Sequence, residues 1–149
     1  ATYLLPRWYG REGDAAAFAE EATRLHPAGA EIYARIVWSQ HTLHKGEFFA
    51  TSGYNWEKTR AGFDAMLAAW PANKNLQAFA YFACRAKDRE LARDLFQKND
   101  DTPPVIAVWR TSAYFAQCKR WALWQKKNSR SSIPAPKPIP MPTPATPSF

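Results

Sequence analysis

The stretch NLQAFAYFACRAKDRELARDLF, residues 75–96, decides the fold of this chain. Most of its residues are good helix formers, and it has no run of β-branched residues that would favour a strand. Apolar side chains recur three or four positions apart on both sides of Lys87–Asp88, which is the spacing of one helical face. We therefore predict two helices joined by a tight turn at Lys87–Asp88.

The same signals extend the helical prediction outward along the chain. Cap-like Asp14 precedes an Ala-rich helix that stops at Pro27, and capping-type Asn55 precedes another. A further apolar stripe covers 30–41, and a long final helix is predicted from Val105 to Lys127. Six helices with short links predict an all-α fold of antiparallel helical hairpins.

The sequence contains a short internal repeat with a period near 33 residues. The tetrapeptide AYFA occurs at 80–83 and again at 113–116, and EFFA at 47–50 and AAFA at 16–19 extend the series. The EFFA copy is the weakest because Gly46 interrupts its helix. A period in the low thirties is typical of helix–turn–helix repeats.

Residues 75–96 resemble a tetratricopeptide repeat. Ala80 and Ala92 stand where that family has small residues at the close approach of the two helices in a hairpin. Phe96 stands where the family has an aromatic residue four positions later. The resemblance implies that each hairpin buries its apolar face against the next one.

The sequence departs from the family pattern at Leu76 and Ala83, where the family usually has Trp and Tyr. The likeness covers about residues 55–125 well and the first third loosely. It implies a short solenoid of stacked hairpins, with a helical repeat domain over 1–130. The segments LLPRWYG, WEKTRAGF and FAYFACRAKD are also similar to segments of bacterial proteins of unknown function, which supplies no activity.

Apolar residues on the predicted helical faces define the expected core. Ala80 and Ala92 are expected at a close helix crossing. The residues expected to be mainly buried are Phe63, Phe79, Phe82, Leu91, Leu95, Phe96 and Trp109.

The positive charge of the chain is concentrated in its last third. The formal net charge is +7, and residues 102–149 carry seven Lys or Arg and no Asp or Glu. The remaining residues are therefore balanced. A one-signed block is typical of an interaction surface or tail.

Basic and aromatic residues alternate at the end of the last predicted helix. One interpretation is that the Trp side chains pack on the preceding hairpin while the cations face solvent. The other is a surface that binds anionic membrane or nucleic acid, because both present phosphates. The residues concerned are Lys119, Arg120, Trp121, Trp124, Lys126, Lys127 and Arg130.

Residues 131–149 are predicted to form an extended proline-rich arm. Proline recurs at every second position from 134 to 144, which fixes φ and favours a polyproline II-like ribbon. We expect the arm to dock on another protein chain or on a groove of this domain, and the sequence favours a partner chain. Its expected contact residues are Ile133, Pro136, Pro138, Ile139, Pro140, Met141 and Phe149.

The two cysteines are 34 residues apart, about one repeat. Cys84 and Cys118 would then lie on neighbouring helices with related orientation. Buried free thiols are the favoured interpretation, and a disulfide is the alternative, which requires Cα atoms within about 7 Å. A disulfide would indicate an oxidising compartment.

Candidate catalytic groups are sparse in the sequence. His41, His44 and Glu47 are spaced three apart, as metal ligands on one helical face can be, but surface histidines are the favoured interpretation. Adjacent acid pairs at 20–21 and 100–101 point in different directions or lie in a loop. We expect no enzymatic activity and no cofactor.

The sequence therefore predicts a non-enzymatic scaffolding subunit whose partners are other proteins. The alternative is the membrane or nucleic-acid binder, and an enzyme acting on sugars or peptides ranks third. No segment approaches the roughly 20 apolar residues of a membrane span. A bacterial cytoplasmic and a periplasmic location both stay open.

Overall fold

A computed structural model of the chain describes residues 11, 13–43, 47–124 and 139. These residues form helices and connecting turns and contain no strand, which confirms the all-α prediction over the part described. The elements are α1 (Asp14–Leu25), α2 (Gly29–Gln40), η2 (His41–Leu43), α3 (Phe48–Thr51), α4 (Trp56–Ala69), α5 (Asn73–Arg85), α6 (Arg89–Lys98), α7 (Ile106–Trp109) and α8 (Ser112–Leu123).

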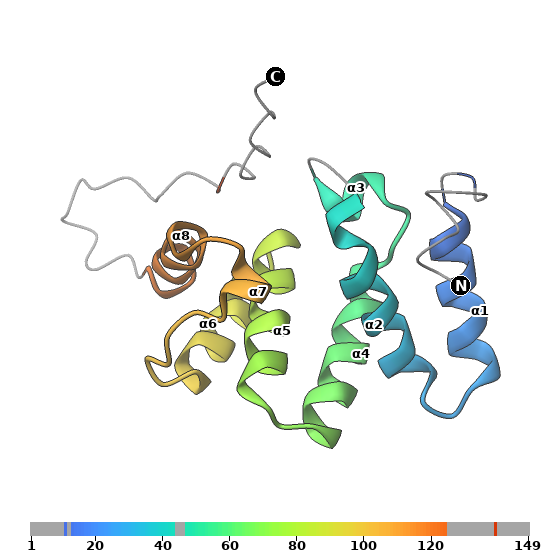
Figure 1. Cartoon of the computed structure of the whole chain (residues 1–149), viewed down its shortest axis with the longest axis horizontal. Helices are drawn as coiled ribbons and strands as arrows, with labels where there is room; N and C mark the ends of the chain where they lie inside the picture. The colour runs from blue at the N-terminus through green and yellow to red at the C-terminus, as the bar shows by residue number, and fades with distance from the viewer. Residues whose placement is uncertain (1–10, 12, 44–46, 125–138, 140–149) are drawn as a thin grey trace.

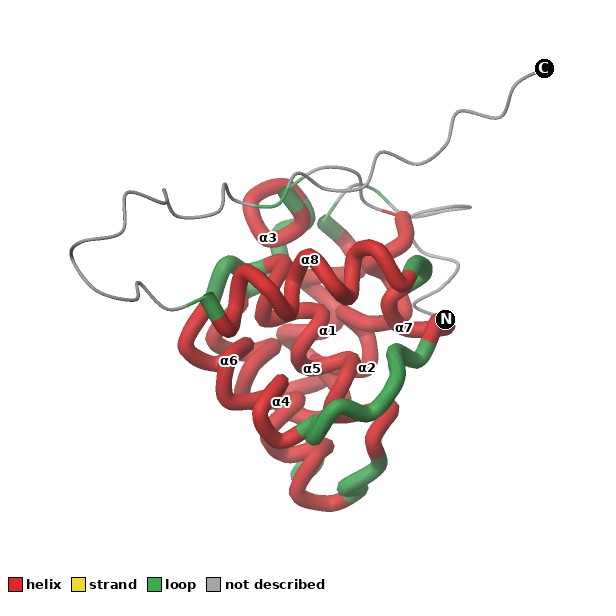
Figure 2. The backbone as a smooth tube through the Cα atoms, turned by 90° about the vertical axis from the view of Figure 1, so that its left-hand side faces the viewer, coloured by secondary structure: helices red, strands yellow, loops and turns green. Residues whose placement is uncertain are grey.

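Helices that follow one another in the chain also lie side by side in space. Helix α1 packs on α2, α2 on α4, α4 on α5, α5 on α6, and α6 on α8 (Figure 1). Seen from the α8 end, α6 and α8 lie side by side in front of α4 and α5 (Figure 2). Most packing is thus between neighbours, so the array is built from one end to the other.

The predicted helix from Val105 to Lys127 is wrong, because two helices occupy its described part. Arg110 has φ +66°, which breaks the helical hydrogen-bond pattern after α7. The Thr111 hydroxyl then accepts a hydrogen bond from the Tyr114 amide at 3.1 Å and starts α8. The bend lets α7 contact α5 while α8 contacts α6.

Helix starts agree with the predicted caps in one case and differ in another. The Asn55 side chain accepts from the Lys58 amide at 3.0 Å, as expected of the cap of α4. At α1 the cap position is Gly13, and Asp14 is the first helical residue. The Asp14 carboxylate instead accepts from the Arg11 amide at 2.7 Å.

The short helix α3 explains why α2 and α4 pack directly on each other. With only four residues, α3 does not separate its neighbours as a full helix would. Gly62 of α4 lies where a Cβ atom would clash with the Ala30 carbonyl oxygen and stand 2.7 Å from the Ala34 Cβ. Gly62 therefore marks a place where α4 comes very close to α2. The sequence analysis did not single out this residue.

The predicted core is confirmed at all but one position. Phe63 stacks on Phe79 and Phe82 with ring centroids 5.4 and 5.3 Å away, which joins α4 to α5. Leu91 is only partly buried. The other predicted residues, Phe63, Phe79, Phe82, Leu95, Phe96 and Trp109, are buried, and so are Ala80 and Ala92.

A buried glutamine fixes the loop between α6 and α7. Gln77 of α5 donates through Nε2 to the Pro103 carbonyl at 2.9 Å. Its Oε1 accepts from the Val105 amide at 2.7 Å and from Trp109 Nε1 at 3.0 Å. One side chain therefore pairs several polar groups that the fold buries, in keeping with the cost of leaving them without partners.

Asp88 links the turn at Lys87–Asp88 to α4. Its Oδ1 caps α6 by accepting from the Leu91 amide at 3.3 Å. Its Oδ2 accepts from Trp56 Nε1 and Arg60 Nη1, both at 3.1 Å. Lys87 has φ +60°, so the predicted tight turn is present and uses a left-handed residue.

Candidate functional site

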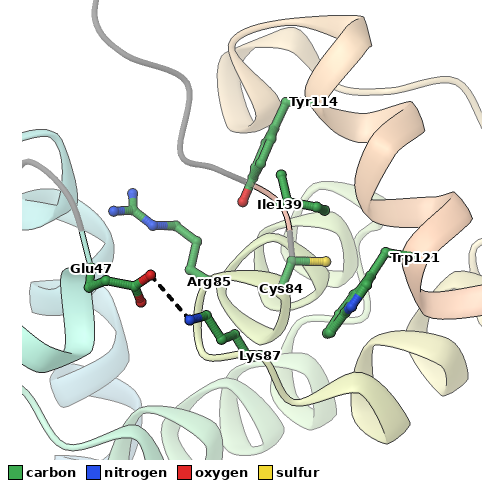
Figure 3. Close-up of a pocket in the computed structure, with 7 residues that line it drawn as sticks. All are labelled: Glu47, Cys84, Arg85, Lys87, Tyr114, Trp121 and Ile139. Atoms are coloured by element: carbon green, nitrogen blue, oxygen red, sulfur yellow. Dashed lines mark ion pairs between the residues drawn. The ribbon is translucent and has the colours of Figure 1, made fainter. Parts of the chain in front are cut away.

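A pocket lies between the end of α5 with the turn after it, the segment before α3, and α8. It has a volume of about 240 Å³ and is drawn in Figure 3. One side is apolar or aromatic, and the other carries charged side chains. Its lining residues are Glu47, Cys84, Arg85, Lys87, Tyr114, Trp121 and Ile139.

A disulfide joins the two helices that form the pocket. Cys84 of α5 and Cys118 of α8 are bonded, with Cα atoms 6.2 Å apart. The sequence left a disulfide and buried thiols open and favoured thiols, so the favoured interpretation differs from the structure. Cys118 is fully buried, whereas Cys84 keeps 8% exposure and lines the pocket.

The apolar side of the pocket includes a residue from the proline-rich arm. Ile139 is half-buried and packs against the core, and Figure 3 shows its side chain among Cys84, Tyr114 and Trp121. At this residue the arm contacts its own helical domain, whereas the sequence analysis favoured a partner chain. The other arm residues, Ile133, Pro136, Pro138, Pro140, Met141 and Phe149, lie outside the described residues.

The charged side of the pocket has one ion pair within the lining and one arginine that contacts residues outside it. Lys87 Nζ stands 3.1 Å from Glu47 Oε1, an exposed ion pair worth little in stability (Figure 3). Arg85 is buried, donates to the Tyr81 hydroxyl at 2.9 Å, and places its guanidinium 5.2 Å from the Phe48 ring centroid. These contacts fix the positions of both cations.

Tyr114 presents a neutral hydroxyl to this environment. Burial raises the pKa of Tyr114 well above its ordinary value, and neighbouring Tyr81 adds to the rise. A tyrosine with a raised pKa keeps its proton at neutral pH and is therefore a poor general base. The pocket is better suited to binding an apolar side chain than to proton transfer.

The two tryptophans predicted at the basic end both have contacts within the fold. Trp121 lines the pocket, and Trp124 contacts Arg89 of α6. Arg89 of α6 donates to the Trp121 carbonyl at 3.0 Å and to the Trp124 carbonyl, and its guanidinium stands 5.1 Å from the Trp124 ring centroid. Arg93 donates to the Ala122 carbonyl at 3.2 Å. Two arginines thus satisfy carbonyl groups at the carboxyl end of α8, where positive charge is favourable.

Of the cations predicted in this region, two lie among the described residues. Lys119 pairs with Asp101 at 2.5 Å, and its hydrogen bond lowers the pKa of that carboxyl group. Arg120 is exposed on α8. The remaining predicted cations, Lys126, Lys127 and Arg130, lie outside the described residues.

The sequence analysis favoured surface histidines, and this is wrong for His41. His41 is buried at 8% exposure, and its Nδ1 contacts the Trp38 carbonyl oxygen. The pKa of His41 is lowered to about 4, mainly by burial and in part by the charges of Arg85 and Arg110. His44 lies outside the described residues, and among those described no three His, Cys, Asp or Glu side chains could hold a metal ion.

Sequence reasoning singled out Trp121, Ile139 and Cys84, considered Glu47 only as a possible metal ligand, and missed Arg85, Lys87 and Tyr114. Glu47, Arg85, Lys87 and Tyr114 come from three separate segments, so no local spacing joins them. The only sequence signal for Tyr114 was its place in the second AYFA copy.

Comparisons of this chain with protein-family models, curated proteins and solved structures found no match. Within the part of the chain that the structure describes, no helix has both the length and the apolar character needed to span a bilayer.

Proposed function

We propose that this chain is a non-enzymatic interaction subunit of a larger protein assembly, with a tetratricopeptide-like array of helical hairpins as its scaffold. The observation that carries the proposal is the pocket between α5 and α8, in which an isoleucine of the proline-rich arm packs beside aromatic side chains. Grooves lined by aromatic residues are a common means of binding proline-rich segments.

The repeat supports the array as the scaffold. Its copies at 80–83 and 113–116 fall in α5 and α8, and the Tyr and Phe of both copies are buried. The flanking alanines are buried in α5 but exposed in α8. This difference is expected if α8 is an end of the described array, because one of its faces then lacks a neighbouring helix.

The chemistry of the pocket supports binding over catalysis. Its carboxylate, Glu47, forms an ion pair with Lys87, and its phenol, Tyr114, is held neutral by burial. A general acid–base pair would need titrating groups poised near the working pH.

Affinity purification of the tagged chain from its source organism tests the proposal. We expect partner proteins to co-purify in a fixed ratio with the full chain and to be lost when the chain is cut after Ser132. A control is Ile106→Ser, which replaces an exposed isoleucine of α7 that does not line the pocket. Unchanged assembly by the truncated chain would mean that the arm is only a spacer, and would contradict the proposal.

The membrane or nucleic-acid binder stays a prediction of the sequence. The described Trp121 and Trp124 are engaged with the pocket and with Arg89, so they do not add support to it. Binding to anionic liposomes and to nucleic acid across a salt series checks it, since phosphate binding weakens steeply with salt.

A further inference from the structure

We propose that the pocket between α5 and α8 is a receptor for the side chain of Ile139, through which the proline-rich arm docks on the helical domain of the same chain. The inference rests on the proposed function, because it names the ligand class of that pocket: a branched aliphatic residue between prolines. It commits to the arm in cis, where the sequence alone favoured a partner chain.

The first step in the argument is the chemistry of the contact. Ile139 lies beside the aromatic side chains of Tyr114 and Trp121 and beside Cys84, half of the disulfide (Figure 3). These are the apolar members of the lining, while Glu47 and Lys87 pair with each other at the far side. Burial of an aliphatic side chain against such surfaces is favourable in proportion to the area removed from water.

The second step is that the receptor side is preorganised. The ring of Tyr114 packs against those of Tyr81 and Trp109, with centroids 5.7 and 5.9 Å away. The disulfide fixes α8 to α5, and Arg89 binds the Trp121 carbonyl at 3.0 Å. Little conformational freedom is therefore lost on the domain when the isoleucine docks.

The third step concerns the ligand side. Pro138 and Pro140 flank Ile139 in the sequence. Each proline restricts φ before docking, so less backbone entropy is lost when the isoleucine is held.

The fourth step explains why the same chain supplies the isoleucine. Fourteen residues lie between Trp124, at the end of the described α8 segment, and Ile139. Such a connection can span at most roughly 50 Å, enough to return to the pocket on the face of α8. A short tether gives an effective concentration on the order of millimolar, so the cis arm outcompetes arms of other copies at ordinary concentrations.

The test measures competition for the pocket with full-length chains. A fluorescent peptide of residues 133–149 is titrated with the wild-type chain, with Ile139→Asp and with the control Ile133→Asp, each checked for a wild-type helical circular dichroism signal. Because Ile139→Asp vacates the pocket, we expect it to bind the peptide at least about tenfold more tightly than the wild type or the Ile133→Asp control. A peptide carrying Ile139→Asp should not bind any of them.

Two results would overturn the inference. If no chain binds the peptide, or if the Ile139→Asp peptide binds equally well, the pocket is not a receptor for Ile139. If the wild type binds the peptide as tightly as the variant does, the arm does not occupy the pocket in cis. Light scattering that then shows dimers of the wild type and monomers of Ile139→Asp would identify a second copy as the occupant. None of these measurements uses another protein. They therefore test the docking of the arm alone, and the purification experiment tests the proposed role in an assembly.

Discussion

Two polar side chains that the fold buries, His41 and Gln77, show how single residues set the properties of this protein. His41 contacts the Trp38 carbonyl and the edges of the Tyr81 and Phe82 rings, with centroids 5.5 and 5.3 Å away. Gln77 connects α5 to the loop before α7. Each makes a different testable contribution to stability.

His41 is expected to make stability depend on pH. Its pKa is about 4 in the folded chain, against 6.5 in an unfolded one, because burial disfavours the charged imidazolium. Between these values the unfolded state binds more protons, so the free energy of unfolding falls as pH falls from about 6.5 to about 4. Urea unfolding of wild type and His41→Gln at pH 7 and pH 4.5 measures the effect. The wild type should lose about 2 kcal/mol more than the variant over this interval.

The control for the pH experiment is Thr42→Gln, a change without a titrating group at an exposed position next to His41. It should keep the pH dependence of the wild type. Equal losses for wild type and His41→Gln would show that His41 does not titrate in this way.

Gln77 is expected to make a large contribution to the free energy of unfolding, because it pairs several buried polar groups. Gln77→Leu keeps a similar volume but leaves the Val105 amide, Trp109 Nε1 and the Pro103 carbonyl without their partner. A buried polar group left without a hydrogen bond costs about 1–3 kcal/mol, so we expect a loss of roughly 3 kcal/mol in total. The exposed Gln97 of α6 is the matched control, and Gln97→Leu should change the free energy of unfolding by less than about 0.5 kcal/mol. Equal effects of the two changes in urea unfolding would contradict the role of Gln77.

At the scale of the element, the two AYFA copies place the same four residues in two helices that are packed differently, α5 and α8. Ala92 of α6 is buried at 0% exposure. Within the motif, Ala80 and Ala83 of α5 are buried at 3% and 0% exposure, whereas their counterparts Ala113 and Ala116 of α8 are exposed. The same residue type in the same motif therefore has neighbours on different numbers of sides. The difference comes from position in the array and not from local sequence.

Enlarging these alanines measures that difference. Ala80→Leu and Ala92→Leu should each overpack the interior and lower the free energy of unfolding by roughly 1–3 kcal/mol. Ala116→Leu inserts the same side chain on an exposed face and should have almost no effect. Thermal denaturation of the three variants checks the prediction, and an unchanged midpoint for Ala80→Leu combined with Ala92→Leu would refute the assigned packing of α5 on α6.

At the scale of the whole molecule, the disulfide links α5 to α8, which are separated in the chain by α6 and α7. The bond joins Cys84 to Cys118, a separation of 34 residues that encloses α6 and α7. A cross-link of this loop length restricts the unfolded chain by an amount worth about 3–4 kcal/mol. It also fixes one wall of the pocket to the other.

Reduction of the disulfide should therefore lower the stability of the whole domain. We expect the urea midpoint of the wild type to fall in dithiothreitol, while the double variant Cys84→Ala and Cys118→Ala should show the same lower midpoint with and without the reductant. Mass spectrometry after thiol alkylation reports the state of the cysteines in each sample. A wild-type midpoint that does not respond to complete reduction would contradict a stabilising role for the bond.

Local sequence determined the helices of this protein and most of its core. Helix propensity, the three-to-four spacing of apolar residues and the capping side chain of Asn55 act within a few residues, so they can be read without a structure. The buried positions of Phe63, Phe79 and Phe96 follow from the same spacing. The break after α7 was missed although the Thr111 cap is local to the start of α8. The other contact at the break, from Trp109 to Gln77 of α5, is made between distant residues, and no helical spacing records it.

Only the tertiary structure decided how the pocket is assembled. Its lining comes from the segment before α3, from α5 and the turn after it, from α8, and from Ile139. Their meeting depends on the pairing of Cys84 with Cys118 and on the direct packing of α2 on α4 at Gly62. The sequence identified cysteines one repeat apart and apolar residues in the arm, but it favoured thiols over a disulfide and a partner chain over the chain's own domain. Those choices turn on distances between residues far apart in the chain, and such distances are set only when the helices pack.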